Sequence, residues 1–374
     1  MMRVLRLLVL CAASAACGGD DRPGGDASTD ARADVSVDGS RVDSAIDVPG
    51  PVCETVSARA EALPATLLFQ IDSSNSMNCA FDDRACLTDD PTPDPNDSRW
   101  DVLTRELFAA LALAPGSHRV GAMRFPRAGG ACANDEFLAE IQPLSTSLDT
   151  TRDAIAAIMP DGLSTPTHDA VAFGLGRLAG LERPYLVLAT DGDARVCFGC
   201  DTDCAFDDPS AIERDNDDLV MRVQTAAASG VPTFVVGVPG SQVYREVLSR
   251  IATAGGTARA GCSDTGPTYC HYDLSEGVDF GAELQAALAE IGEAVIACEY
   301  EIPDNPDGAF DPTRVNVRIT TDGTEETIGR DESRSAGWDY TDGETRIELF
   351  GTACDRARAA DQLDILFGCP TLLI

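Results

Sequence analysis

Lysine is absent from this chain of 374 residues, and histidine is nearly so, with only three residues. All 28 basic residues are therefore arginines. Without lysine there is no phosphate-binding P-loop, no Schiff-base chemistry and no Ser-x-x-Lys nucleophile. The shortage of histidine argues against a histidine-rich zinc site. The composition thus excludes several common kinds of enzyme.

Positive charge is scarce as well, because 62 acidic residues outnumber the basic ones and leave a net charge of −34 at pH 7. A surface this acidic repels the phosphates of nucleic acids and anionic lipids. We therefore expect no nucleic-acid partner. With 44% hydrophobic and 24% charged residues, the chain otherwise has an ordinary globular composition and enough length for about two domains.

The apolar run near the N-terminus is too short to span a bilayer and follows Arg3 and Arg6. We interpret residues 1–16 as a signal peptide. The sequence Ser14-Ala15-Ala16-Cys17 resembles a bacterial lipobox. This resemblance implies a lipidated Cys17 and a lipoprotein of the cell envelope, held at the outer membrane or cell surface by its lipid anchor only. Cleavage near the same point without lipidation would instead give a secreted protein.

Apolar residues are rare between the expected anchor and the first strand-like run. Residues 17–50 contain eight aspartates among glycine, alanine, serine and valine. Like charges four residues apart disfavour a helix, and so little apolar surface cannot form a core. We predict a disordered, self-repelling tether over this segment.

Cysteine is abundant, with 14 residues, of which 12 remain once Cys11 and Cys17 are set aside. In an exported chain an even number of cysteines indicates disulfides. The run Cys197-x2-Cys200-x3-Cys204 has a superficial likeness to a zinc knuckle, but an oxidising compartment favours disulfides there too. We predict the pairs Cys79–Cys86, Cys262–Cys270, Cys354–Cys369 and Cys53–Cys298.

Strand-like runs alternate with helical patterns from about residue 66 to residue 297. This alternation predicts an α/β fold, a doubly wound, mostly parallel sheet with helices on both faces, within a domain at 51–298. The expected strands are 66–71, 119–125, 138–141, 185–189 and 231–238. The expected helices are 101–114, 148–159, 169–181, 211–229, 241–253 and 280–297.

The pattern changes after Cys298 to short strands separated by Asp-Gly turns. We predict a small β module at 299–374, stapled by a disulfide, and assign it no function. Its expected strands are 299–302, 315–320, 326–328, 346–350 and 363–367. The closing Phe367-Gly368-Cys369-Pro370 resembles the ends of extracellular proteins from myxobacteria-like bacteria.

Oxygen-bearing side chains gather where the predicted strands end. The first strand runs into Asp72-x-Ser74-x-Ser76, the strand 185–189 runs into Thr190-Asp191-Gly192, and Thr165 lies in a loop before a helix. Ligands of such sheets bind beyond the carboxyl ends of the strands, and residues at i, i+2 and i+4 of an extended segment share one side. Carboxylate and hydroxyl oxygens suit Mg²⁺. We therefore predict a magnesium site at this edge.

These five residues resemble the metal-ion-dependent adhesion site (MIDAS) of von Willebrand factor type A (VWA) domains. The resemblance covers residues 53–298 and implies that Ser74 and Ser76 bind Mg²⁺ or Mn²⁺ directly. It implies that Asp72 and Asp191 act largely through water and that Thr165 engages according to conformational state. The remaining coordination position would take an Asp or Glu carboxylate of a protein ligand.

The function that we predict is therefore Mg²⁺-dependent binding of a protein partner by an envelope lipoprotein, with no enzymatic activity. Two alternatives stay open. A metal-dependent hydrolase would need a base such as Asp191, Asp193 or His168, although no nucleophile is evident. In a structural envelope protein the metal would only stabilise the fold. Acidic inserts at 78–98 and 194–210 are expected beside the metal.

Overall fold

The computed structural model describes residues 56–80, 98–127, 135–162, 164–192, 209–276, 279–306 and 308–374. The chain divides after Val52 into two units, and all described residues belong to the second. The expected signal peptide, the tether and Cys17 lie outside the described residues, as does most of each acidic insert. Within the described ranges, the helices are too short or too polar to cross a bilayer.

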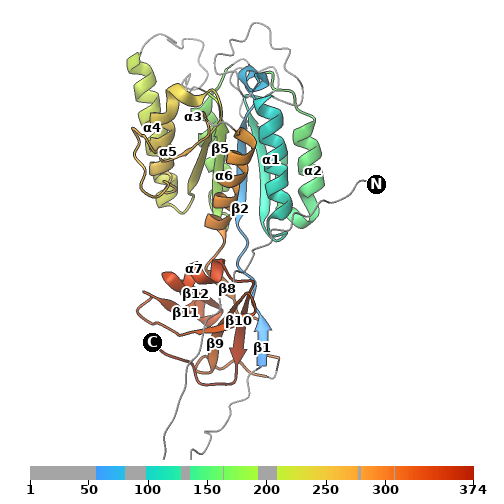
Figure 1. Ribbon diagram of the computed structural model, residues 1–374, viewed down its shortest axis with the longest axis vertical. Coiled ribbons are helices and arrows are strands. Elements are labelled where there is room, and N and C mark those ends of the chain that lie inside the picture. Colours follow the sequence, from blue (N-terminus) through green and yellow to red (C-terminus); the bar gives the residue numbers. More distant parts are fainter. Residues whose placement is uncertain are drawn as a thin grey trace, which may run out of the picture. The chain divides into compact units, whose positions relative to one another are not determined.

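A six-stranded sheet forms the centre of the α/β domain (Figure 1). Its strands lie in the order β4-β3-β2-β5-β6-β7. All neighbouring pairs are parallel except β3 with β4. The predicted doubly wound, mostly parallel α/β fold is therefore confirmed. The strands are β2 (Thr66–Asp72), β3 (Arg119–Phe125), β4 (Glu136–Pro143), β5 (Pro184–Thr190), β6 (Thr233–Gly237) and β7 (Tyr272–Asp273).

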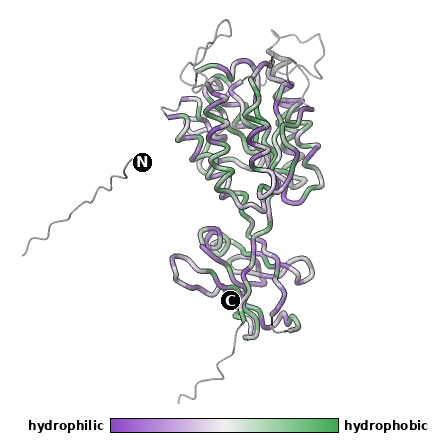
Figure 2. Tube along the Cα trace, turned by 90° about the vertical axis from the view of Figure 1, so that its right-hand side faces the viewer, coloured by the Kyte–Doolittle hydropathy of each residue, from purple (hydrophilic) through white to green (hydrophobic). Residues whose placement is uncertain are grey.

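Two hydrophobic cores, one on each face, hold the helices against this sheet. Strand β2 is buried along its whole length, and its side chains alternate, with Leu67 and Phe69 in one core and Leu68 in the other. Hydrophobic stretches accordingly run through the middle of this domain (Figure 2). One face carries α1 (Arg99–Leu113), α2 (Leu144–Ala156) and α6 (Phe280–Val295), and the other carries α3 (Thr167–Leu178), α4 (Pro209–Ala228) and α5 (Arg245–Ala254).

The predicted helix 241–253 is divided in the structure. A 3₁₀ turn, η3 (Ser241–Tyr244), precedes α5, and Tyr244 has the non-helical angles φ −112° and ψ 4°. Helix α2 begins four residues earlier than predicted, at Leu144, directly after Pro143 at the end of β4. The two-residue strand β7 was not predicted, because so short a segment carries no alternating pattern.

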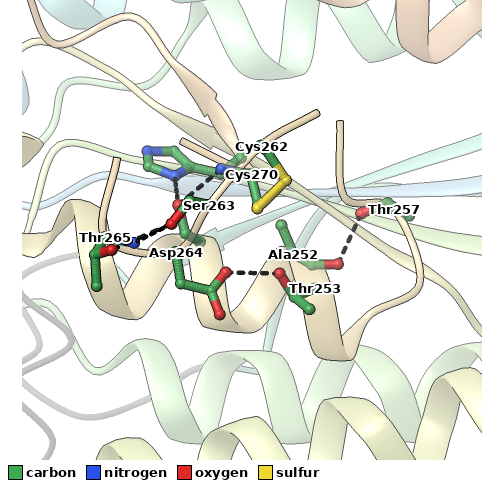
Figure 3. The surroundings of a disulfide bond; sticks show 10 residues. Ala252, Thr253, Thr257, Cys262, Ser263, Asp264, Thr265 and Cys270 are labelled. Atoms are coloured by element: carbon green, nitrogen blue, oxygen red, sulfur yellow. Dashed lines mark hydrogen bonds between the residues drawn. A yellow bond between two sulfur atoms is a disulfide. The ribbon is translucent and has the colours of Figure 1, made fainter. Parts of the chain in front are cut away.

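The loop that leads into β7 is closed by the predicted disulfide Cys262–Cys270, which is confirmed (Figure 3). The hydroxyl of Thr253 in α5 donates to the carboxylate of Asp264 in the loop at 2.7 Å, and Cys270 N donates to the Oγ of Ser249 in α5 at 2.9 Å. These bonds attach the loop to α5.

The small module contains two antiparallel sheets, in the orders β1-β13-β9-β10 and β11-β12-β8, around a separate core that includes Trp338. Strand β1 falls within the range 51–298 yet pairs with β13, so the module uses two segments of the chain. The helix α7 (Thr352–Arg358) was not predicted either. The strands are β1 (Val56–Arg59), β8 (Glu299–Glu301), β9 (Val315–Thr321), β10 (Thr324–Ile328), β11 (Gly337–Thr341), β12 (Arg346–Phe350) and β13 (Gln362–Phe367).

Two predicted disulfides are wrong, because Cys298 pairs with Cys354 and not with Cys53, and Cys354 does not pair with Cys369. Strand pairing explains the correction: β8 lies beside β12, and Leu349 N donates to Cys298 O at 2.8 Å. Cys354 follows in the first turn of α7. Cys79 and Cys369 are also disulfide-bonded, while Cys86 and the Cys197 run lie outside the described residues.

Replacing Cys298 and Cys354 together with serine is expected to lower the free energy of unfolding by about 2–4 kcal/mol, because the bridge closes 56 residues of chain. Urea unfolding would measure the loss. The serine pair at Cys262 and Cys270 is the control, and its loss should be smaller because it closes only 8 residues. Peptide mapping without reduction that joined Cys354 to Cys369 would contradict this connectivity.

Candidate metal centre

Asp72 is the last residue of β2 and is completely buried. Its Oδ1 accepts a hydrogen bond from Ser74 N at 2.8 Å, and its Oδ2 accepts one from Thr190 Oγ1 at 2.6 Å. The hydroxyl of Thr190 in turn accepts from Gly192 N at 3.1 Å. Thr190 therefore orients the first carboxylate from the end of the neighbouring strand β5, a role that the sequence analysis missed.

The two serines and Asp191 form a chain of oxygen contacts. Ser74 Oγ lies 3.0 Å from Ser76 Oγ, and Ser76 Oγ donates to Asp191 Oδ1 at 3.0 Å. Ser74 and Asp191 are buried, whereas Ser76, in the 3₁₀ turn η1 (Asn75–Asn78), is only half-buried. The structure thus brings together four of the five predicted residues, and Asp191 reaches Ser76 across 115 positions of the sequence.

The fifth residue, Thr165, lies against the loop that carries Asp191. A Cβ added at Gly192 would be 3.2 Å from Thr165 Oγ1. The segment before Thr165 is tied to the Asp72 loop, because Gly162 N donates to Ser73 O at 3.0 Å and Asn75 N donates to Gly162 O at 2.9 Å. A Cβ at Gly162 would collide with the ring of Pro126, so this close approach requires glycine.

A buried arginine that the sequence analysis missed completes the centre. Arg99, the first residue of α1, donates from Nη1 to Asp191 Oδ2 at 2.6 Å, and its side chain is 3% exposed. Arg99 follows the insert 78–98, which separates it from the Asp72 loop in the sequence. The N-cap at Ser98, whose Oγ accepts from Asp101 N at 3.0 Å, starts α1 early enough to place Arg99 there.

Two carboxylates held together in the interior favour a cation between them. Burial raises the pKa of Asp72 to about 7, and repulsion from Asp191 contributes to the rise against the hydrogen bonds from Thr190 and Ser74. Burial also raises the pKa of Asp191, against the opposing effect of Arg99. Mg²⁺ binds carboxylate and hydroxyl oxygens of this kind and needs only one or two carboxylates. The donor set therefore fits Mg²⁺.

Among the described ranges, no three aspartate, glutamate, histidine or cysteine side chains converge as a metal cluster. The centre differs from such a cluster because serine and threonine hydroxyls stand beside its two carboxylates. Fold and site together define a doubly wound α/β domain with a hydroxyl–carboxylate centre at the carboxyl edge of its sheet.

His168, which the sequence places near Thr165, is engaged in the first turn of α3. Its Nε2 lies 2.6 Å from Asp218 Oδ2, and its Nδ1 lies 3.4 Å from Asp169 Oδ1. The hydrogen bond with Asp169 raises the pKa of His168, burial opposes the rise, and the bond with Asp218 adds to it. This histidine therefore joins α3 to α4 and is not available as a base at the centre.

The pH dependence of stability should report this contact. Because the pKa of folded His168 lies above its unfolded value of 6.5, its stabilisation is fully present below that value and is lost as the pH rises through the folded pKa. His168→Gln is therefore expected to lower the free energy of unfolding more at about pH 5.5 than at about pH 8.5. Urea unfolding at both values checks this, and an equal loss would contradict it.

No protein-family model matches the chain, and no curated protein matches it either. The PilB minor pilin from Streptococcus sanguinis has a similar structure, with 17% identity and a TM-score of 0.45 over 63% of this chain and 62% of that one. A von Willebrand factor type A protein from Catenulispora acidiphila has 11% identity and a TM-score of 0.40, over 86% and 61% of the two chains.

Proximal thread matrix protein 1 from the mussel byssus, solved with a zinc-occupied MIDAS motif, is also similar. It has 15% identity and a TM-score of 0.41, over 66% of this chain and 51% of that one. The chain spans less than two thirds of the length of each of these three proteins. Structural similarity at such TM-scores gives no information about function. The assignment of the candidate metal centre therefore depends on the geometry of this chain alone.

Proposed function

We propose that this chain binds a protein partner through Mg²⁺ or Mn²⁺ held by Asp72, Ser74, Ser76, Thr165 and Asp191. The observation that carries the proposal is the meeting of two buried carboxylates with serine hydroxyls at the carboxyl end of β2 and β5. Ser76 and Thr165 are half-buried and are thus more exposed than the other three residues, so we place the accessible side of the centre there. From that side a carboxylate of Asp or Glu on the partner would complete the coordination of the metal.

The hydrogen bonds that engage the candidate general bases favour a binding function over hydrolysis. Asp191 is held by both Ser76 and Arg99, and His168 is held by Asp218 and Asp169. Asp193 lies outside the described residues. A hydrolase needs a free general base beside the metal, and the described candidates are already engaged in structural hydrogen bonds. We therefore propose a binding protein and not an enzyme.

The test is capture of partners from a cell-envelope extract on the immobilised full chain in Mg²⁺, followed by elution with EDTA. A second portion of the extract is first treated to amidate its carboxyl groups. The proposal expects proteins that EDTA releases and that amidation removes, and it expects an Asp72→Asn chain to retain none of them. Capture that survives both EDTA and amidation would overturn the proposed mode of binding.

We also propose that lipidation of Cys17 anchors the chain in the cell envelope, with secretion as the alternative. The support is the lipobox-like sequence before Cys17 and the acidic segment 17–50 behind it. A Cys17→Ser chain is expected to leave the membrane fraction and to lose incorporation of labelled fatty acid. Retention of either property would contradict the anchor.

A further inference from the structure

Arg99 is a fixed positive charge inside the candidate metal centre. Besides its ion pair with Asp191, its Nη1 lies 3.5 Å from the carbonyl oxygen of Ser76. A Cβ added at Gly240 would collide with the guanidinium, so the backbone after β6 also packs against it. The guanidinium is therefore confined between α1, the Ser76 turn and the loop after β6.

Arg99 changes the net charge of the side chains around a bound metal ion. Asp72 and Asp191 together carry two negative charges when ionised, and Arg99 reduces their net charge to −1. A divalent cation would then leave the centre with a net charge of +1, in an interior where Asp72 and Asp191 are at most 2% exposed. Uncompensated charge is costly where water is excluded. One anionic oxygen from a ligand would bring the total to zero.

Arg99 also occupies one oxygen of the carboxylate that it neutralises. Asp191 Oδ2 accepts from the guanidinium, while Asp191 Oδ1 faces the Ser76 hydroxyl. Only the second oxygen is directed toward the serines of the centre. The arginine and a metal ion are thus competitors for the charge of the same carboxylate.

We infer that Arg99 is a built-in countercharge that weakens metal binding and leaves a bound metal dependent on a ligand carboxylate. The inference rests on the proposed function, since it specifies how that centre selects an anionic partner. Metal and carboxylate ligand would then bind cooperatively, because each supplies charge that the other lacks. The coupling works in both directions, as thermodynamic linkage requires.

Titration of the full chain with Mn²⁺ by calorimetry tests the inference, with Arg99→Gln as the variant. Gln keeps a hydrogen-bond donor near Asp191 but removes the charge. Its Kd for Mn²⁺ is expected to fall at least about tenfold below that of the wild type, because a positive charge a few ångströms away repels a divalent cation even where the interaction is screened. Arg99→Lys, which keeps the charge, should stay within about threefold of the wild type.

A matched control separates this local effect from the loss of one positive charge anywhere. Arg318 in the small module pairs with the buried Asp364 at 3.0 Å, as Arg99 pairs with Asp191. Arg318→Gln changes the net charge of the chain by the same amount but leaves the centre alone. Its Kd for Mn²⁺ should equal that of the wild type, and a gain there as large as in Arg99→Gln would overturn the inference.

The possible outcomes distinguish this inference from the proposed function. Tighter binding by Arg99→Gln than by the wild type supports both. Binding by the wild type that Arg99→Gln does not strengthen overturns the inference alone. Binding by Arg99→Gln but not by the wild type, even with acetate added as the ligand carboxylate, supports the countercharge and overturns the proposed function, and no binding by either under the same conditions overturns both.

Folding of the variant provides a second readout. If Arg99→Gln unfolds without metal, Mn²⁺ is expected to restore its near-ultraviolet circular dichroism, because the metal would replace the missing positive charge. Failure of Mn²⁺ to restore the fold would contradict the role of Arg99 as a countercharge.

Discussion

Asp72→Asn is expected to weaken Mn²⁺ binding by about 10–100-fold, the range for loss of an outer-shell partner of a metal, because this carboxylate is expected to act on the metal largely through water. Asn can still accept from Ser74 N, so the loop should keep its conformation. The melting temperature without metal should stay level or rise, since one of two mutually repelling buried carboxylates is gone. Calorimetric titration and thermal unfolding of the full chain measure the two effects.

The control for Asp72→Asn is a second copy of the same short motif. Asp331-x-Ser333-x-Ser335 lies in the small module, and both hydroxyls donate to the Asp331 carboxylate, at 2.6 and 2.8 Å. Three backbone N–H groups of the same turn donate to it as well, and these hydrogen bonds hold the pKa of Asp331 well below its usual range. The oxygens are already saturated by protein donors.

Asp331→Asn should therefore leave the Kd for Mn²⁺ unchanged and destabilise the module. If it weakened Mn²⁺ binding as much as Asp72→Asn, or if Asp72→Asn bound Mn²⁺ normally, the assignment of the centre to the Asp72 loop would be wrong. Because the two motifs have the same residue types at the same spacing, a difference in Mn²⁺ binding between the two variants would come from the surroundings of each motif in the fold.

The two motifs show what the sequence could predict about the centre. The strand before Asp72 is mostly apolar, and its burial on both faces places its end at the carboxyl edge of a parallel sheet. Asp331 lies between β10 and β11, where no such run precedes it. The predicted strands of the α/β domain therefore locate the Asp72 motif at the carboxyl edge of the sheet, and no predicted strand locates the Asp331 motif at such an edge.

The predicted strands could not reveal the roles of Arg99 and Thr190, although the position of each residue follows from local rules of helix and strand formation. Thr190 was predicted to follow the strand 185–189 and is the last residue of β5, and only the register with β2 brings its hydroxyl to Asp72. Arg99 depends on where α1 begins, and helix termini are the part of a periodic pattern that the sequence defines least well. One turn of displacement would remove this charge from the centre.

Contacts between distant segments account for the remaining errors. Strand β1 has only four residues, and its place is set by β13 near the other end of the chain. The Cys298–Cys354 bridge depends on the pairing of β8 with β12 in the same way. Spacing along the sequence favours neighbours, as in the correctly predicted Cys262–Cys270, and cannot determine partners that a sheet brings together.

Trp338→Ala is expected to lower the free energy of unfolding of the small module by about 3–5 kcal/mol. The side chain is completely buried, its Nε1 donates to Ile328 O at 3.0 Å, and its ring meets Tyr340 edge-on at 5.1 Å. Truncation removes the largest buried side chain of this core and leaves Ile328 O without its indole donor. Trp338→Phe should lose less, because it keeps most of the volume and only forfeits the hydrogen bond.

This substitution also tests the independence of the two cores. Trp338 belongs to the core of the module, whereas the strands that lead to Asp72 and Asp191 belong to the two cores of the α/β domain. Trp338→Ala should therefore lower the unfolding temperature of the module and leave the Kd for Mn²⁺ within about twofold, since effects at distant sites without shared partners are close to additive. Loss of Mn²⁺ binding together with the fold of the module would contradict this independence and show that the module supports the centre.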